Sequence, residues 1–105
     1  MIPEIITSIP GPRSQALAAR LREHESRNVT YMNHLWPVFW DRASGVNVWD
    51  ADGNRFLDFT SAFGVAGLGH RNPEIVEAMK EQSEQLLHGM GDVHPTALKV
   101  VLGEQ

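Results

Sequence analysis

The sequence contains no cysteine, which excludes disulfide bonds and cysteine-ligated zinc sites. It also has no apolar run near the ~20 residues that a membrane-spanning helix needs. Positive charge is scarce, because nine Lys and Arg stand against thirteen Asp and Glu and leave a net charge of −4. We therefore expect neither a nucleic acid nor a membrane as a partner, since both attract proteins through basic surfaces.

The first ten residues lack the basic start of a secretory leader, and Pro3 and Glu4 interrupt their apolar character. We expect a cytoplasmic protein on this basis. What the sequence does contain is ordinary for a folded domain, with 42% hydrophobic and 21% charged residues. The composition therefore predicts a packed structure rather than a disordered chain.

The first half of the chain predicts one helix and a small antiparallel sheet. A helix is expected over residues 12–25, where Pro12 suits the first helical position and the apolar face is thin. An apolar strand follows over 38–40 and is broken by residues 43–45. Residues 46–49 alternate in the two-residue period of a strand, and 56–59 form the returning strand. Between them Asp52 and Gly53 supply the chemistry of a hairpin turn.

The second half predicts two more helices. The first begins at Pro73 after the capping residue Asn72 and runs to about residue 87. The second begins at Pro95. In the first we expect a buried apolar face made of Ile75, Val76, Met79, Leu86 and Leu87. In the second, Leu98, Val101 and Leu102 share one face.

Together these elements predict an α+β fold in three segments of a single partial domain. Residues 1–37 form an arm and a helix, 38–60 form antiparallel strands with a hairpin, and 61–105 form a loop and helices. Whether the tryptophans lie in the core or on a surface covered by further protein is left open. The expected core residues are Trp40, Trp49, Phe56 and Phe59.

Three sequence features invite a functional interpretation. Asp50, Asp52 and Asn54 have the spacing of a calcium loop, but Arg55 and Ser61 occupy the positions that need Gly and Glu, so a hairpin turn is favoured. Glycines at 64, 67 and 69 are not in the order of a dinucleotide fingerprint. They predict either a loop that lines a cavity or a crowded structural turn.

The histidines do not predict a reactive site. His70, just before a helix, is expected to be a hydrogen-bonding loop residue rather than a catalyst. His88, Asp92 and His94 are possible metal ligands, but their spacing matches no established pattern, and we predict no metal. No serine or threonine lies in a nucleophile-elbow context.

A longer pattern is more specific than any of these motifs. Residues 48–59 read VWDADGNRFLDF, preceded by Arg42-Ala43-Ser-Gly45, and residues 69–82 read GHRNPEIVEAMKEQ. In this order and spacing the stretch from Val38 to Gln82 resembles the N-terminal segment of class III aminotransferases. These are pyridoxal-phosphate enzymes of fold type I.

The resemblance implies the N-terminal part of a small domain, which packs against the rest of a transaminase chain and a second subunit of a homodimer. It implies an activity that moves an amino group between an amine or ω-amino acid and a 2-oxo acid. It also implies that Phe63, with Gly64 and Val65 beside it, lines the substrate entrance. Ala62 stands where the family commonly has glycine, which implies a stiffer loop.

The same resemblance implies that the reactive groups lie outside this sequence. Neither Lys80 nor Lys99 matches the family's Schiff-base lysine, so no catalytic and no cofactor-binding residue is assigned here. We expect pyridoxal 5'-phosphate to bind a longer parent protein and not to bind this chain stably. The chain alone would then be inactive. The alternative is a stand-alone, non-catalytic α+β module that binds a partner through its tryptophan-rich sheet.

Overall fold

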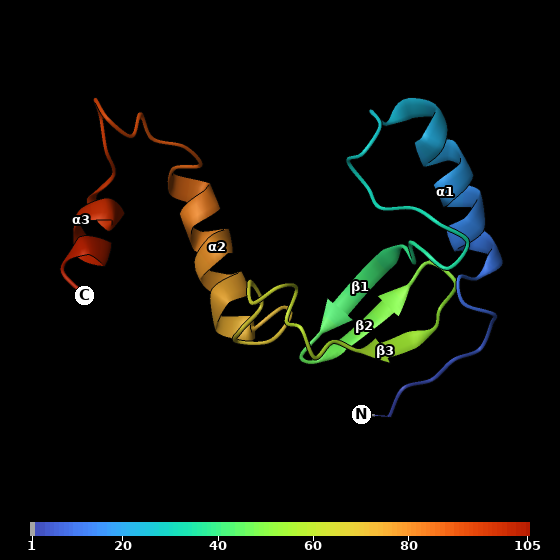
Figure 1. The fold of residues 1–105 in the computed structure, drawn as a ribbon. Coiled ribbons are helices and arrows are strands. Elements are labelled where there is room, and N and C mark those ends of the chain that lie inside the picture. The colour runs from blue at the N-terminus through green and yellow to red at the C-terminus, as the bar shows by residue number, and fades with distance from the viewer. Residues whose placement is uncertain (1) are drawn as a thin grey trace. The chain divides into compact units, whose positions relative to one another are not determined.

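A computed structural model describes residues 2–105 and divides them into two compact units. The first ends at Asn72 and the second begins at Pro73. The first holds helix α1 (Pro12–His24) and strands β1 (Trp40–Ser44), β2 (Asn47–Asp50) and β3 (Arg55–Leu57), and the second holds helices α2 (Pro73–Gln85) and α3 (Ala97–Gly103) (Figure 1). This confirms the predicted α+β arrangement of a helix, antiparallel strands and further helices. None of the helices among residues 2–105 is long and apolar enough to cross a bilayer.

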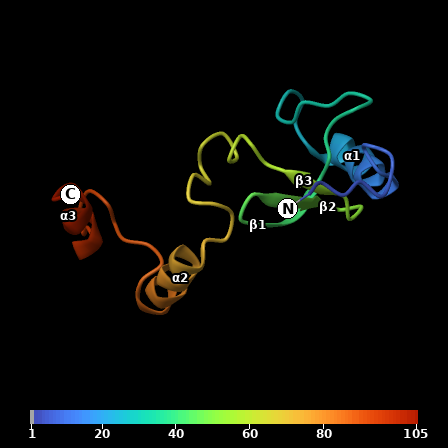
Figure 2. The same ribbon diagram turned by 90° about the horizontal axis from the view of Figure 1, so that it is seen from below.

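The three strands form one antiparallel sheet in the order β1-β2-β3 (Figure 2). Ala43 and Ser44 lie inside β1, paired with Val48 and Asn47, so the prediction that they break the strand was wrong. Only two residues are needed to reverse the chain here, and Gly45 makes this possible with φ +58°. The predicted turn between β2 and β3 is confirmed, with Gly53 at φ +87°.

The core of the first unit is largely polar. Val48 is 1% exposed and Ala18 is 6% exposed, and Ser14, Asp50 and Asn54 are polar side chains buried beside them. The predicted aromatic core is wrong for Trp40 and Phe59, which are 52% and 86% exposed, while Trp49 and Phe56 are half-buried. Trp40 lies on an edge strand and Phe59 lies beyond the end of β3, so the sheet itself covers neither. Trp49 instead stacks under the Arg42 guanidinium, whose Cζ is 4.1 Å from the ring centroid.

Asn54 and Asp50 hold the N-terminal arm to the sheet through a buried hydrogen-bond network. The Asn54 side-chain oxygen accepts from the amides of Ile6 and Thr7 at 2.7 and 2.9 Å. Its amide nitrogen donates to the Thr7 hydroxyl and to the Asp50 carboxylate. The Asp50–Asn54 segment therefore works as a hairpin turn and a structural junction, in agreement with the sequence.

Asp52 reaches from the same turn to the start of α1. Its two carboxylate oxygens accept from the backbone amides of Arg13 and Ser14 at 2.6 and 2.9 Å. Burial raises the pKa of Asp52, but hydrogen bonds from Ser14 and Arg13 outweigh it and leave the pKa below the ordinary 3.8. A side chain 38 residues away thus satisfies helix amides that the N-cap residue, Gly11, cannot cap.

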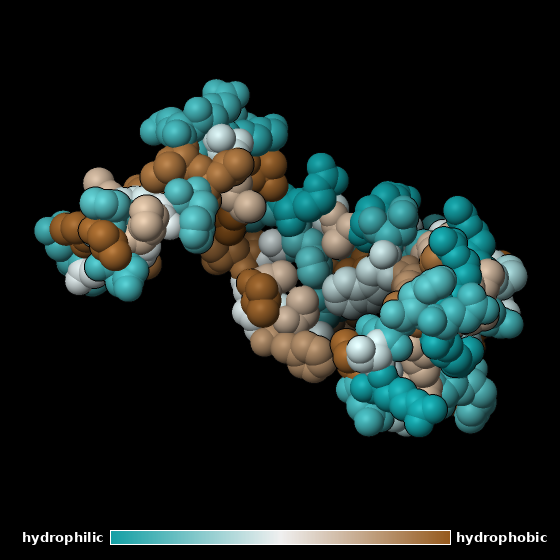
Figure 3. Space-filling view, turned by 90° about the horizontal axis from the view of Figure 1, so that it is seen from above, coloured by the Kyte–Doolittle hydropathy of each residue, from teal (hydrophilic) through white to brown (hydrophobic). Residues whose placement is uncertain are grey.

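The second unit consists of two helices that bury no side chain. Helix α2 begins at Pro73 as predicted and ends at Gln85, two residues early, and α3 begins at Ala97 rather than at Pro95. The expected burial of the apolar face of α2 was wrong, since Met79 is 68% and Leu87 is 84% exposed. On α3, Leu102 is 77% exposed. Figure 3 shows apolar side chains, in brown, at the surface. Amphipathic spacing specifies which face is apolar, but burial needs a surface that covers that face.

Candidate functional site

The predicted substrate-lining residues lie in a loop that closes on the turn between β1 and β2. Residue 58 begins this loop and residue 70 ends it. The Asp58 amide donates to the Val46 carbonyl at 2.8 Å. His70 and Gly45 exchange two backbone hydrogen bonds, each 2.8 Å long. The two ends of the loop are therefore fixed side by side, as in a compact Ω-loop.

Inside this loop the chain makes a left-handed turn over residues 61–64. Ser61, Ala62 and Phe63 have φ of +51°, +50° and +59°, and Gly64 follows at +86°. Left-handed backbone costs roughly 1–2 kcal/mol at each residue other than glycine, so three in succession need support from their surroundings. Backbone hydrogen bonds from Gly64 to Thr60 and from Ala66 to Ser61 close the turn.

The Asp58 carboxylate stabilises this left-handed turn. One oxygen accepts from the Thr60 amide at 3.0 Å and from the Thr60 hydroxyl at 2.8 Å. The other accepts from the Ala62 amide at 3.0 Å and from His70 Nε2 at 2.7 Å. All four hydrogen bonds come from the loop or from its closing residue, so one side chain organises the whole segment.

Burial and charge strengthen this arrangement. The Asp58 side chain is 4% exposed and that of His70 is 14% exposed. The hydrogen bond from His70, followed by that from Thr60, lowers the pKa of Asp58 from 3.8 to about 2 even though burial raises it. The His70 ring also meets Trp40 edge-on, with centroids 5.8 Å apart. The prediction that His70 is a hydrogen-bonding loop residue is confirmed.

The turn presents apolar side chains to the surroundings. Phe63 is 97% exposed and Val65 is 88% exposed. Behind them a cavity of about 200 Å³ lies between the loop and the β1–β2 turn, lined in part by Gly45, Asp58 and His70. The positive φ of Gly64 and Gly69 confirms that these glycines supply unusual backbone conformations. No partner for Phe63 is present, so its contact with substrate stays a prediction.

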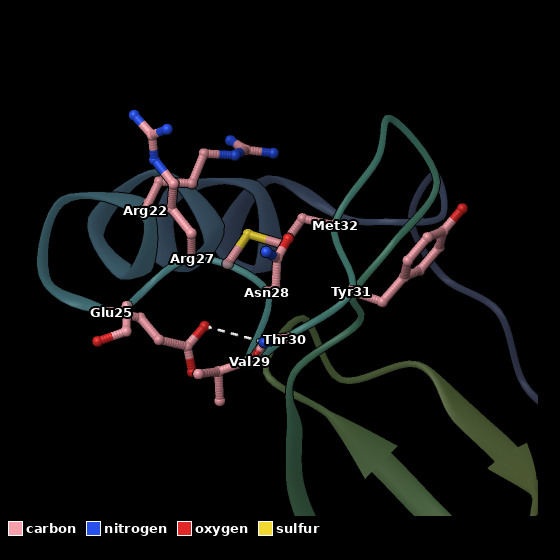
Figure 4. Close-up of a pocket in the computed structure, with 9 residues that line it drawn as sticks. Arg22, Glu25, Arg27, Asn28, Val29, Thr30, Tyr31 and Met32 are labelled. Carbon is pink, nitrogen blue, oxygen red and sulfur yellow. Dashed lines mark hydrogen bonds between the residues drawn. The ribbon is translucent and has the colours of Figure 1, made fainter.

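A second cavity, of about 630 Å³, lies between the end of α1 and the segment that follows it (Figure 4). The Glu25 carboxylate in its wall accepts hydrogen bonds from the amide and hydroxyl of Thr30. The guanidinium groups of Arg22 and Arg27 point away from this carboxylate in Figure 4. No sequence motif had indicated this cavity, and its polar groups do not converge on a common point.

Neither lysine of the described chain lies in surroundings suited to an imine with a cofactor. Lys80 has a 67% exposed side chain beside Glu77, and Lys99 donates to the Gly91 carbonyl at the surface. A lysine that forms such a bond is normally desolvated next to the cofactor. Residues 2–105 also contain no group of three His, Cys, Asp or Glu residues that could hold a metal ion. The residues present thus do not fit pyridoxal phosphate by themselves.

Comparison with known proteins identifies relatives of this chain. Residues 28–105 match the family described as aminotransferase class-III. The chain is 38% identical over 101 residues to 4-aminobutyrate aminotransferase of Mycobacterium tuberculosis, covering 96% of this chain and 22% of that protein. It is 45% identical over 71 residues to glutamate-1-semialdehyde 2,1-aminomutase of Methanothrix thermoacetophila, covering 67% and 16%.

Solved structures agree with these relatives. Acetylornithine aminotransferase from Elizabethkingia anophelis superposes with a TM-score of 0.71 at 31% identity, over 87% of this chain and 23% of that one. Taurine:2-oxoglutarate aminotransferase from Bifidobacterium kashiwanohense, solved with PLP and glutamate, gives 0.70 at 27% identity, over 96% and 21%. The chain spans less than a quarter of the length of each of these relatives. It belongs to the class-III aminotransferase family.

Proposed function

We propose that this chain supplies part of the substrate wall of a pyridoxal-phosphate-dependent transaminase. Membership of the class-III family supports this, as does the name of each relative described above. The parent protein would transfer an amino group between an amine or ω-amino acid and a 2-oxo acid. A homodimeric parent and a cytoplasmic location belong to the same proposal and rest on the family and on the sequence.

Within this function Phe63, Gly64 and Val65 form the wall that contacts the substrate. The observation that carries this step is the left-handed turn, which presents Phe63 almost fully exposed on backbone of high energy. Strained backbone persists where surrounding structure enforces it, and it is concentrated at ligand sites. An apolar wall beside a few polar anchors is typical of small-molecule pockets.

We further propose that the chain alone does not catalyse transamination. The exposure of Lys80 and Lys99 supports this, because a lysine that forms an imine is normally desolvated beside the cofactor. The pyridoxal chemistry would come from the rest of the parent protein. No reaction step is assigned to residues of this chain.

The wall is tested by Phe63→Ala in the transaminase that carries this chain. We expect kcat/KM to fall about 10- to 100-fold, with a changed order of preference among amino donors, because a contact in the pocket is lost. Leu68→Ala is the matched control, since Leu68 is 74% exposed in the same loop but outside the turn. Equal kinetics for Phe63→Ala and the natural protein would contradict the proposal.

The inactivity is tested by incubating the 105-residue chain with pyridoxal phosphate and reducing with borohydride. We expect pyridoxal phosphate to attach to both Lys80 and Lys99, and the amount attached to keep rising with its concentration. Saturable one-to-one attachment, abolished by Lys80→Arg or Lys99→Arg alone, would contradict this proposal. It would also favour a chain that binds cofactor by itself.

A further inference from the structure

The Asp58–His70 pair is not explained by the substrate wall, because neither side chain is part of it. The two side chains are 4% and 14% exposed, their atoms are 2.7 Å apart, and they lie twelve residues apart at opposite ends of one loop. A largely buried carboxylate–imidazole pair adds little to stability when an apolar pair would pack as well. We therefore look for the role of this pair in the structure of the loop that it joins.

We propose that Asp58 and His70 are positioning residues that hold Phe63 in its place in the substrate wall. This rests on the proposed function, since it assigns these residues a role in that same site. Asp58 binds the Thr60 and Ala62 amides on both sides of Ser61, where the left-handed backbone begins. His70 fixes the carboxylate from the other end of the loop.

His70 is itself fixed in three directions. Its amide and carbonyl pair with Gly45, its ring meets Trp40, and its Nε2 donates to Asp58. The orientation of the turn is thereby tied to the β1–β2 hairpin, which is the rigid part of the unit. Displacement of the reacting geometry by about 1 Å is enough to cost about a hundredfold in rate, so such support has a functional consequence.

The geometric half of the proposal is tested on the 105-residue chain by amide hydrogen exchange. In Asp58→Asn one oxygen becomes an NH₂ group that faces hydrogen-bond donors, so the turn loses support. We expect the Gly64 and Ala66 amides, which close the turn, to exchange at least about tenfold faster. Unchanged exchange at both amides would overturn the proposal.

The functional half is tested by kinetics in the transaminase that carries this chain. His70→Ala removes the donor, whereas His70→Gln keeps an amide nitrogen near the position of Nε2. We expect His70→Ala to lower kcat/KM about 10- to 100-fold, mainly through KM, and His70→Gln to recover most of the loss. His24→Ala is the matched control, because that side chain is 80% exposed.

A double variant separates positioning from general stability. If His70 acts through Phe63, His70→Ala will have little further effect on kcat/KM in a Phe63→Ala background. Full additivity, or no effect of His70→Ala where Phe63→Ala has one, would overturn the positioning role and leave the proposed function standing. No effect of Phe63→Ala itself would overturn both.

Where His70→Ala lowers the folded fraction, Thr60→Val gives the same test in milder form. It removes only the hydroxyl that donates to Asp58 at 2.8 Å and leaves His70 in place. We expect a smaller loss of kcat/KM in the same direction, again absent in the Phe63→Ala background. A loss that is equally large in both backgrounds would count against the proposal.

Discussion

The unit that ends at Asn72 and the unit that begins at Pro73 are built on different principles. The first holds a sheet, a helix and an arm together through buried polar side chains, notably Asp50 and Asn54. The second consists of helices with apolar faces and no buried residue. The difference teaches that long-range hydrogen bonding stabilises the first unit from within, whereas the second depends on whatever covers its apolar faces.

The largest effect that tests this comparison is expected from Asn54→Ala. The substitution removes four hydrogen bonds, and it takes the Asn54 partner away from Asp50 Oδ2 and from the arm amides of Ile6 and Thr7. We expect the free energy of unfolding of the first unit to fall by about 3 kcal/mol, measured by urea denaturation. Asn47→Ala is the matched control, because its buried Oδ1 has no hydrogen-bond partner. Equal losses in the two variants would contradict the role of the network.

A valine in each unit gives a second comparison. Val48 is 1% exposed in β2, and Val101 is 51% exposed in α3. We expect Val48→Ala to lower the free energy of unfolding by about 2 kcal/mol. Val101→Ala should change it by less than about 0.5 kcal/mol, because it removes little buried area and alanine favours a helix. A loss at Val101 as large as at Val48 would show that the second unit has a core of its own.

One glycine-to-alanine substitution in each unit should also change the free energy of unfolding differently. A Cβ at Gly11 would lie 2.3 Å from the Asp52 Cγ, so the carboxylate that caps α1 would have to move. We expect Gly11→Ala to cost about 1–2 kcal/mol of unfolding free energy through the lost cap. Gly103→Ala in α3, where a Cβ meets nothing within 4 Å, should be neutral or slightly stabilising. A neutral Gly11→Ala would show that Asp52 is not needed at the helix start.

Acid should loosen the loop at residues 58–70 of the first unit through Asp58. The folded pKa of Asp58, about 2, lies below the ordinary 3.8. Its stabilisation is therefore complete above about pH 4 and is lost as the pH falls through about 2. Faster hydrogen exchange of the Gly64 amide between about pH 4 and 2 would confirm this loss of stabilisation. Exchange in the turn that Met90 and His94 close by backbone hydrogen bonds is the internal control. Asp58→Asn should show no such step.

The smallest effect is expected at the exposed pair Glu77 and Lys80 on α2. Their atoms are 3.4 Å apart, and the side chains are 64% and 67% exposed. We expect Glu77→Gln to change the free energy of unfolding by no more than about 0.5 kcal/mol, and less in high salt. A loss above about 1 kcal/mol in a thermal melt would show that this helix is stabilised by its surface charges.

Local features of the sequence predicted the elements well. Pro12 and Pro73 predicted the start of two helices, and Asp52-Gly53 predicted the hairpin, because caps and turns depend on neighbouring residues. Burial was predicted poorly. Trp40 and Phe59 are exposed although large and apolar, since residue type and periodicity do not tell whether another surface covers a side chain.

The organisation of the candidate site was the hardest part to predict. The Asp58–His70 pair joins positions that only the folded loop brings together. The left-handed turn was hidden because Ser61 and Phe63 rarely adopt positive φ. The available signals were Gly64, which ends the turn, and Ala62, at a position where the resembling family commonly has glycine and where φ is +50°. A residue that replaces glycine in such a loop is a sign of left-handed backbone.

Glu4 has a consequence for solubility. Its amide and carbonyl pair with those of Arg55 at 2.9 and 2.7 Å, on the side of β3 that faces away from β2. A bare outer strand offers a template on which foreign chains can polymerise. By pairing with Arg55, Glu4 occupies one of the backbone positions at this rim on which a foreign strand could start to pair.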